Sequence, residues 1–102
     1  MTKITDILCD AKNLKKCINL HYVGHDRTVE VHVVGRNAGT GNTLLRCFQV
    51  SGGSNSGHPT GWKLMDVSKI SRCSLSDVDS HAPRPEYNPD DSAMTAGIIC
   101  HV

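Results

Sequence analysis

Apolar residues at the start of the chain repeat with a helical period. Over residues 3–16 they recur every three or four positions, which places them on one face of an α-helix. Thr2 stands at a capping position and Asp6 in the first turn, where a negative charge favours the helix dipole. The pattern predicts one amphipathic helix over residues 3–16. Its apolar positions are Ile4, Ile7, Leu8, Ala11 and Leu14.

From Cys17 the apolar pattern changes to the alternation of β-strands. The first two strand segments are separated by Gly24-His25-Asp26, which has turn chemistry, and the glycine-rich 35–42 follows as a second hairpin loop. In the third segment Leu45 and Cys47 share one face, while Leu44, Arg46 and Phe48 share the other. Both faces of that strand are therefore expected to be covered. The predicted strands are residues 17–22, 27–34, 43–50, 61–67 and 96–102.

Two segments show neither the helical period nor the alternation of a strand. Residues 68–75 are short and mixed, and indicate only a turn or a short helical piece. Residues 77–93 contain three prolines, several aspartates and few apolar groups, which predicts a surface strap.

The order of these elements predicts a mainly β (α+β) fold. A helix followed by short antiparallel strands and glycine-rich turns is typical of a small sheet that closes on itself. We expect an N-terminal helix followed by a five-stranded SH3-like or Sm-like barrel, made of residues 17–70 and 95–102. With 102 residues the chain is expected to be a single domain, 1–102.

Composition narrows the location and the partners. Eleven basic residues balance ten acidic ones, so no overall field attracts nucleic acid or anionic membranes, and an anion site has to be local. The N-terminus resembles no signal peptide, and no segment is long and apolar enough for a membrane span. Five cysteines, odd in number and without a close pair, favour buried free thiols in a reducing compartment. We expect a cytoplasmic protein without a membrane partner.

Catalytic and metal motifs are absent from the sequence. Neither GxSxG nor HExxH occurs, and the six histidines have no carboxylate or thiolate at a metal-ligand spacing. The loop GRNAGTGN joins two predicted strands and is not followed by a helix, so it is expected to be a hairpin loop and not a phosphate loop. We predict no enzyme activity, no metal and no cofactor.

The strongest candidate chemistry is a set of basic and polar residues on the strands and on the glycine/serine loop 51–61. Arg46 and Gln49 belong to opposite faces of a regular strand, so no single flat surface can use all the candidates. A barrel rim, where strand ends meet loops, would instead gather a subset: Arg36, Arg46, Lys63, Ser51, Ser54 and Asn55. Trp62 fits either core closure or a stacking platform, and the loop either a lid over a ligand or a neutral insertion. The candidate ligand-binding residues are Arg27, His32, Arg36, Arg46, Gln49, Ser51, Ser54, Asn55, Trp62 and Lys63.

Residues 4–72 resemble the WYL domain, in which a helix precedes i-x-Y-x-g-x-x-R-x-V-e-P-h, a strand with the naming tripeptide, and W-R-x-F-x-x-D-R-I. Thr43-Leu44-Leu45 occupies the place of the tripeptide, Val31 that of the proline, Lys63 that of the second arginine and Met65 that of the aromatic residue. The resemblance implies a five-stranded Sm-like or SH3-like barrel that binds a ligand or nucleic acid, here without the usual helix-turn-helix. The matching residues are Tyr22, Arg27, Val29, Glu30, His32, Gly35, Arg46, Trp62 and Ile70.

These observations favour a non-catalytic binding module for a nucleotide-like or other anionic ligand. Such a protein would act as a sensor or would sequester its ligand, in a bacterial or phage defence setting. One alternative is a single-stranded nucleic-acid-binding or transcription-regulatory accessory protein, against which stand only four aromatic residues and the balanced charge. Another is a homo-oligomer built through exposed strand edges.

Overall fold

A computed structural model describes residues 3–53, 60–88 and 91–102 of the chain. In that part of the chain, one α-helix precedes a six-stranded sheet, which confirms a mainly β fold with an N-terminal helix. The elements are α1 (Ile4–Leu14), β1 (Lys16–Tyr22), β2 (His25–Arg36), β3 (Thr43–Gly52), β4 (Gly61–Asp66), the 3-10 turn η1 (Val67–Lys69), β5 (Ile70–Asp79) and β6 (Gly97–His101).

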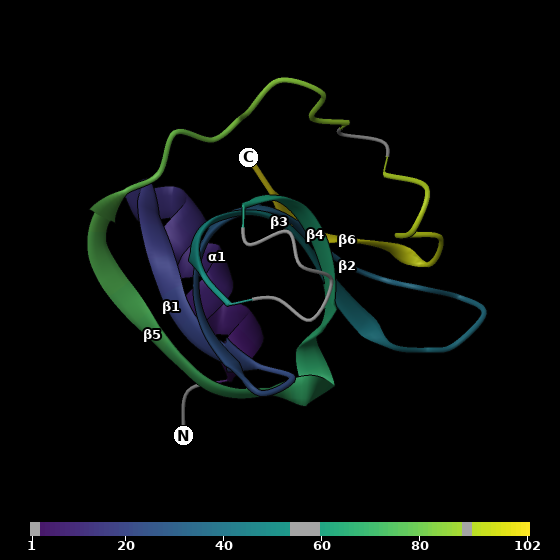
Figure 1. Cartoon of the computed structure of the whole chain (residues 1–102). Helices are drawn as coiled ribbons and strands as arrows, with labels where there is room; N and C mark the ends of the chain where they lie inside the picture. Colours follow the sequence, from purple (N-terminus) through teal and green to yellow (C-terminus); the bar gives the residue numbers. More distant parts are fainter. Residues whose placement is uncertain (1–2, 54–59, 89–90) are drawn as a thin grey trace.

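The sheet is antiparallel throughout and has the strand order β4-β3-β2-β1-β5. Strand β2 is long enough to pair with β1 along its first part and with β6 along its last part, while β3 follows it on the other edge. The sheet is strongly curved (Figure 1). Within the described residues the outer strands β4 and β5 do not pair, so the sheet is open and does not form the predicted closed barrel.

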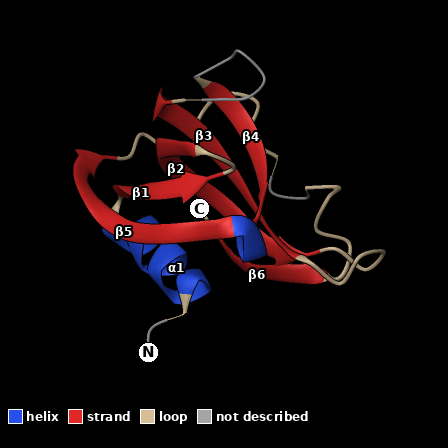
Figure 2. Cartoon of the chain, turned by 60° about the horizontal axis from the view of Figure 1, so that its bottom comes forward, coloured by secondary structure: helices blue, strands red, loops and turns tan. Residues whose placement is uncertain are grey.

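Helix α1 packs on one face of the curved sheet, against β1, β2 and β5 (Figure 2). Leu8 and Ala11 are its fully buried positions, and they meet a core of apolar side chains from β1 to β5. The helix ends at Lys15, which adopts the left-handed conformation of a C-cap with φ 57°. At its start, Lys3 and not the predicted Thr2 is the N-cap residue, and it makes no side-chain cap; Thr2 lies outside the described residues.

A bulge in β2 moves the apolar face along the strand. Val31 pairs with Cys47, but Val33 pairs with Arg46, so His32 is an extra residue on β2. After the bulge, Val34 lies opposite Leu45 and returns to the core. The bulge thus lets both Val31 and Val34 reach the core, within a run of β2 that is buried continuously from Val29 to Gly35.

Two sequence-based assignments change in the structure. Residues 70–79, most of which were left unassigned or given to the strap, form β5, an edge strand that pairs only with β1. Only Ile70 and Ser76 of β5 are buried, so the strand carries little of the alternation that would reveal it. The strap is consequently residues 80–96, of which 80–88 and 91–96 are described, and it crosses from the end of β5 to β6 (Figure 1).

The prediction that all five cysteines are free is wrong. Cys9 of α1 and Cys100 of β6 form a disulfide, with a Cα–Cα distance of 6.0 Å, whereas Cys17, Cys47 and Cys73 are free as expected. The two partners are 91 residues apart, so no local spacing reveals the pair. Because disulfides are typical of oxidising compartments, the cysteines no longer support a cytoplasmic location. No described helix has the length and apolar character that crossing a membrane requires.

Candidate functional site

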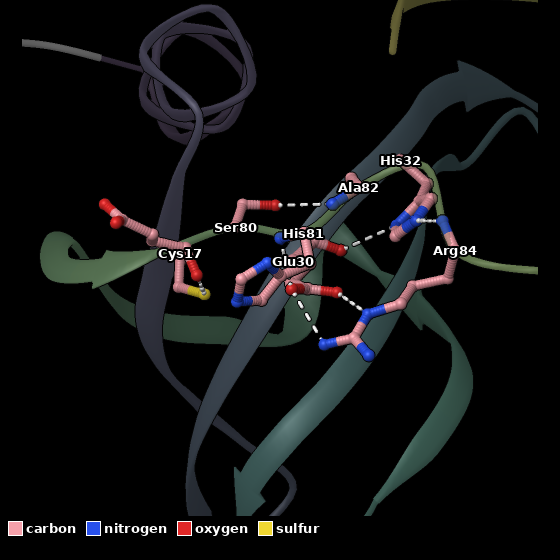
Figure 3. Close-up of polar contacts among 8 residues, drawn as sticks. Cys17, Glu30, His32, Ser80, His81, Ala82 and Arg84 are labelled. Carbon is pink, nitrogen blue, oxygen red and sulfur yellow. Dashed lines mark hydrogen bonds and ion pairs between the residues drawn. The ribbon is translucent and has the colours of Figure 1, made fainter.

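The strap covers the face of β2 opposite to α1 and buries a polar cluster there. This strap cluster consists of Glu30 and His32 from β2 and His81 and Arg84 from the strap (Figure 3). Glu30 and His32 are both 0% exposed. Alternation along β2 would direct these two side chains to solvent, and the strap is what removes them from it.

Glu30 is paired with Arg84 in a bidentate ion pair. The Arg84 Nε donates to Oε1 at 2.6 Å and Nη2 to Oε2 at 3.1 Å, while the backbone N–H of His81 donates to Oε2 at 2.6 Å. The Arg84 guanidinium also lies 4.6 Å from the centre of the Phe48 ring. Burial raises the pKa of Glu30, but the hydrogen bonds from Arg84 and His81 outweigh it and bring the pKa below its ordinary value.

Both ring nitrogens of His32 have backbone partners. Nδ1 lies 3.0 Å from the carbonyl oxygen of Glu30, which can only accept, and Nε2 lies 3.1 Å from the backbone N–H of Arg84, which can only donate. The imidazole is therefore neutral with its proton on Nδ1, and burial lowers its pKa. Its ring is 4.6 Å from that of Trp62 and 5.7 Å from that of Tyr87.

Arg46 faces the same strap but is already neutralised. Its Nε donates to Asp91 at 2.8 Å and its Nη2 at 3.4 Å, and this hydrogen bonding lowers the pKa of Asp91, which is only 7% exposed. A cleft of about 260 Å³ lies beside the pair. Two carboxylates and one guanidinium line it, so its net charge does not favour an anion. The lining residues are Arg46, Trp62, Glu86, Asn88, Asp91 and Ser92.

Arg27 lies on the other face of the sheet and, unlike Arg46, has no carboxylate partner among the described residues. It is 6% exposed, and its Nη1 donates to the neutral amide oxygen of Gln49 at 3.3 Å. Its guanidinium stacks at 5.2 Å from the Tyr22 ring centre, and its Nε has no hydrogen-bond partner among the described residues. No acidic side chain of the described chain forms an ion pair with it. Within the part of the chain that the structure describes, this buried positive charge therefore has no ion-pair partner.

The start of the glycine/serine loop is held against this end of β2. Gln49 donates through Nε2 to the Gly53 carbonyl at 3.0 Å, and the Gly53 N–H donates to the Asp26 carbonyl at 3.2 Å. A Cβ on Gly52 would lie 2.3 Å from the Asp26 oxygen, so only glycine allows this approach of the two backbones. The loop therefore leaves β3 directly beside Arg27.

The structure divides the predicted ligand-binding residues into separate groups. His32, Arg46 and Trp62 meet under the strap, while Arg27 and Gln49 meet on the opposite face. Ser51 is paired with Thr28 near Arg27, and Lys63 is paired with Cys47 on the Gln49 side of the sheet. Ser54 and Asn55 lie outside the described residues.

Arg36 does not join these groups. It pairs with Thr43, eight residues along β3 from Ser51, which corresponds to about 26 Å at the usual rise per strand residue. The rim that would bring Arg36 together with the loop residues is therefore not formed, because β2 and β3 run side by side over their whole length.

Sequence reasoning missed the strap residues that complete the buried clusters. The strap was interpreted by its composition, yet it contributes Arg84 to Glu30, Asp91 to Arg46 and the Tyr87 ring to His32. The one signal available was Arg84-Pro85-Glu86-Tyr87, an arginine and an aromatic residue inside an otherwise polar segment.

The chain matches no protein-family model, no curated protein sequence and no solved structure. The resemblance to the WYL domain remains an interpretation of its motif residues, several of which, including Tyr22, Arg27 and His32, are the groups described above.

Proposed function

We propose that this protein is a non-catalytic binding module that holds a small anionic ligand, such as a nucleotide phosphate, against Arg27. The observation that carries the proposal is the buried guanidinium of Arg27, whose Nε has no hydrogen-bond partner and which forms no ion pair among the described residues. A buried charge without a partner costs several kcal/mol. An oxyanion would supply both the counter-charge and the missing acceptor, and arginine binds phosphate through two parallel N–H groups.

The surroundings of Arg27 also favour an anion. Burial raises the pKa of the nearby Cys47 thiol to about 12, and the positive charges that oppose this rise are those of Arg27, Arg46 and Lys63. Arg27 therefore contributes a positive potential to this part of the interior, beside the amide of Gln49. This site differs from the Arg46 cleft, where Asp91 already occupies the guanidinium.

The fold is compatible with this proposal. The strand order β4-β3-β2-β1-β5 and the 3-10 turn leading into β5 are those expected of an SH3-like or Sm-like fold, here with an open sheet, and the WYL resemblance includes Tyr22 and Arg27. We infer that the chain is an open-sheet relative of these small barrels, used as a ligand sensor or a sequestering protein.

Calorimetric titration with inorganic phosphate, AMP and ATP tests the proposal. Arg27→Met retains a side chain of similar length over Tyr22 but removes the charge, and Arg36→Met removes an exposed arginine at the far end of β2 as the matched control. We expect Arg27→Met to weaken binding of the phosphate-bearing probe at least tenfold, and Arg36→Met to leave it unchanged.

Stability without added anion separates binding from a purely structural role. Removing an unpaired buried charge should leave the free energy of unfolding unchanged or raise it in phosphate-free buffer. If Arg27→Met instead destabilises the protein by more than about 2 kcal/mol and no probe binds the parent, the arginine is structural and the proposal fails. Oligonucleotide binding that weakens steeply with salt would instead favour the nucleic-acid alternative.

A further inference from the structure

His32 is a buried titratable group that the proposed anion site does not use. It lies in the contact between β2 and the strap, with Glu30 on its own strand and Arg84 from the strap beside it (Figure 3). The rings of Trp62 from β4 and Tyr87 from the strap also lie close to it. The backbone N–H of Arg84 depends on its Nε2 as an acceptor. This hydrogen bond between the strap and the sheet therefore requires one protonation state of the His32 imidazole.

We propose that His32 is a proton-operated latch, which holds residues 81–87 of the strap on the sheet when it is neutral and releases them when it is protonated. A proton on Nε2 would face the Arg84 N–H at 3.1 Å, so two donors would meet where a hydrogen bond now exists. The partly buried Arg84 amide would lose its acceptor.

The charges around His32 strengthen this effect. Glu30 and Arg84 neutralise each other through their bidentate pair, and the Tyr87 phenol is uncharged near neutral pH. Protonation of His32 would therefore add an uncompensated positive charge to the buried cluster. Glu30 does not take up this proton first, because its hydrogen bonds to Arg84 and His81 hold its pKa below the ordinary value.

The direction of the pH dependence follows from linkage. In the closed state burial lowers the pKa of His32, while in the open state it returns to about 6.5. The neutral imidazole thus contributes fully to closure of the strap on the sheet above pH 6.5. This contribution decreases as the pH falls below 6.5. The ratio of closed to open strap should drop up to tenfold per pH unit, until the pH reaches the closed-state pKa.

Release should be confined to the first half of the strap. The second half is held by groups that do not titrate between pH 5 and 8: Arg46 with Asp91, the Asn37 amide with the Ala93 carbonyl, and Thr95 with the Ala38 N–H. Beyond it, β6 pairs with β2 and is joined to α1 by the disulfide. Opening would uncover the Phe48 and Trp62 rings without unfolding the sheet.

Nuclear magnetic resonance on the full, disulfide-bonded chain tests the latch. At pH 8 the ¹⁵N shifts of the His32 ring should show the proton on Nδ1. Between pH 6.5 and 5, the hydrogen-exchange rate of the Arg84 amide, corrected for intrinsic rate, should rise up to tenfold per unit, while that of Met94, whose amide donates within the second half, should not.

His32→Asn provides the decisive variant, because its amide does not titrate. Exchange at Arg84 should then lose its pH dependence, whereas His101→Asn, a change at an exposed histidine, should keep it. A His32 proton on Nε2 at pH 8, or protonation of His32 without faster exchange at Arg84, would overturn the proposal. These two measurements use the parent protein, so they decide the question even if His32→Asn does not fold.

Discussion

Replacement of Arg84 by methionine should destabilise the protein through the carboxylate it leaves behind. Glu30 is 0% exposed and accepts three hydrogen bonds, two of them from the Arg84 guanidinium. In Arg84→Met the carboxylate keeps only the N–H of His81. Methionine still covers part of the Phe48 ring, so the change removes mainly the charge.

The size of the effect follows from the burial of the two partners. Breaking a buried ion pair by removing one partner typically costs about 3–5 kcal/mol. The Arg84 side chain is 29% exposed, and water screens part of its interaction with Glu30, so we expect a value near the lower limit, about 3 kcal/mol. A small domain with a typical total stability would remain folded at this cost.

Urea denaturation of the non-reduced protein at pH 7.5 measures this loss. With a slope of about 1.5 kcal/mol/M, a loss of 3 kcal/mol moves the midpoint by about 2 M. The matched control is Arg72→Met, because Arg72 is 74% exposed and pairs with Asp26 at 3.6 Å. Because water screens that exposed pair, Arg72→Met should leave the urea midpoint nearly unchanged.

A double variant separates the charge effect from lost packing. In Arg84→Met with Glu30→Gln, neither charge of the Glu30–Arg84 pair remains, so no unpaired carboxylate is buried there and the double variant should be more stable than Arg84→Met alone by about 1–2 kcal/mol. If it is instead less stable by the full sum of the single changes, the orphaned carboxylate is not the cause. A loss below about 1 kcal/mol in Arg84→Met would likewise refute the reasoning.

Three further outcomes follow from the same structure. Thiol titration of the denatured, unreduced protein should find three free thiols, and reduction of the α1–β6 disulfide, which spans 91 residues, should lower the free energy of unfolding by up to about 4.6 kcal/mol. Gly35→Ala should lower the thermal midpoint, because its Cβ would lie 2.7 Å from the Gly97 oxygen and separate β6 from β2. Asp91→Ala should accelerate amide exchange at Met94 at every pH, because Arg46 loses its strap partner.

The sequence predicted the parts of the sheet where alternation is strong. Leu45 and Cys47, which the pattern placed on one face of their strand, both lie in the core with Val29 and Val31, and residues 37–42 of GRNAGTGN form the hairpin loop between β2 and β3. The pattern did not predict β5, because β5 is an edge strand with few buried side chains. The disulfide was not predicted, because its two cysteines are brought together only by the packing of α1 beside β6.

The candidate site was harder to predict because burial on the second face depends on the strap. Glu30 and His32 alternate with valines, as solvent-facing residues of a half-buried strand do. Nothing local indicates that a segment fifty residues later returns over them. The pattern could therefore identify basic and aromatic residues as candidates. It could not indicate which of them find an ion-pair or hydrogen-bond partner within the chain.

The arginines of this protein differ in whether a carboxylate of the described chain balances their charge. Arg84 and Arg46 each hold a carboxylate in a two-bond pair, so their charges are balanced within the chain and they fasten the strap. Arg27 is more deeply buried than either, yet its hydrogen bond goes to a neutral amide and its Nε has no partner in the described chain. A fold that pairs its other buried charges so completely has no structural reason to retain an unpaired one. The absent counter-charge at Arg27, rather than the arginines under the strap, is therefore the stronger argument for an anionic ligand.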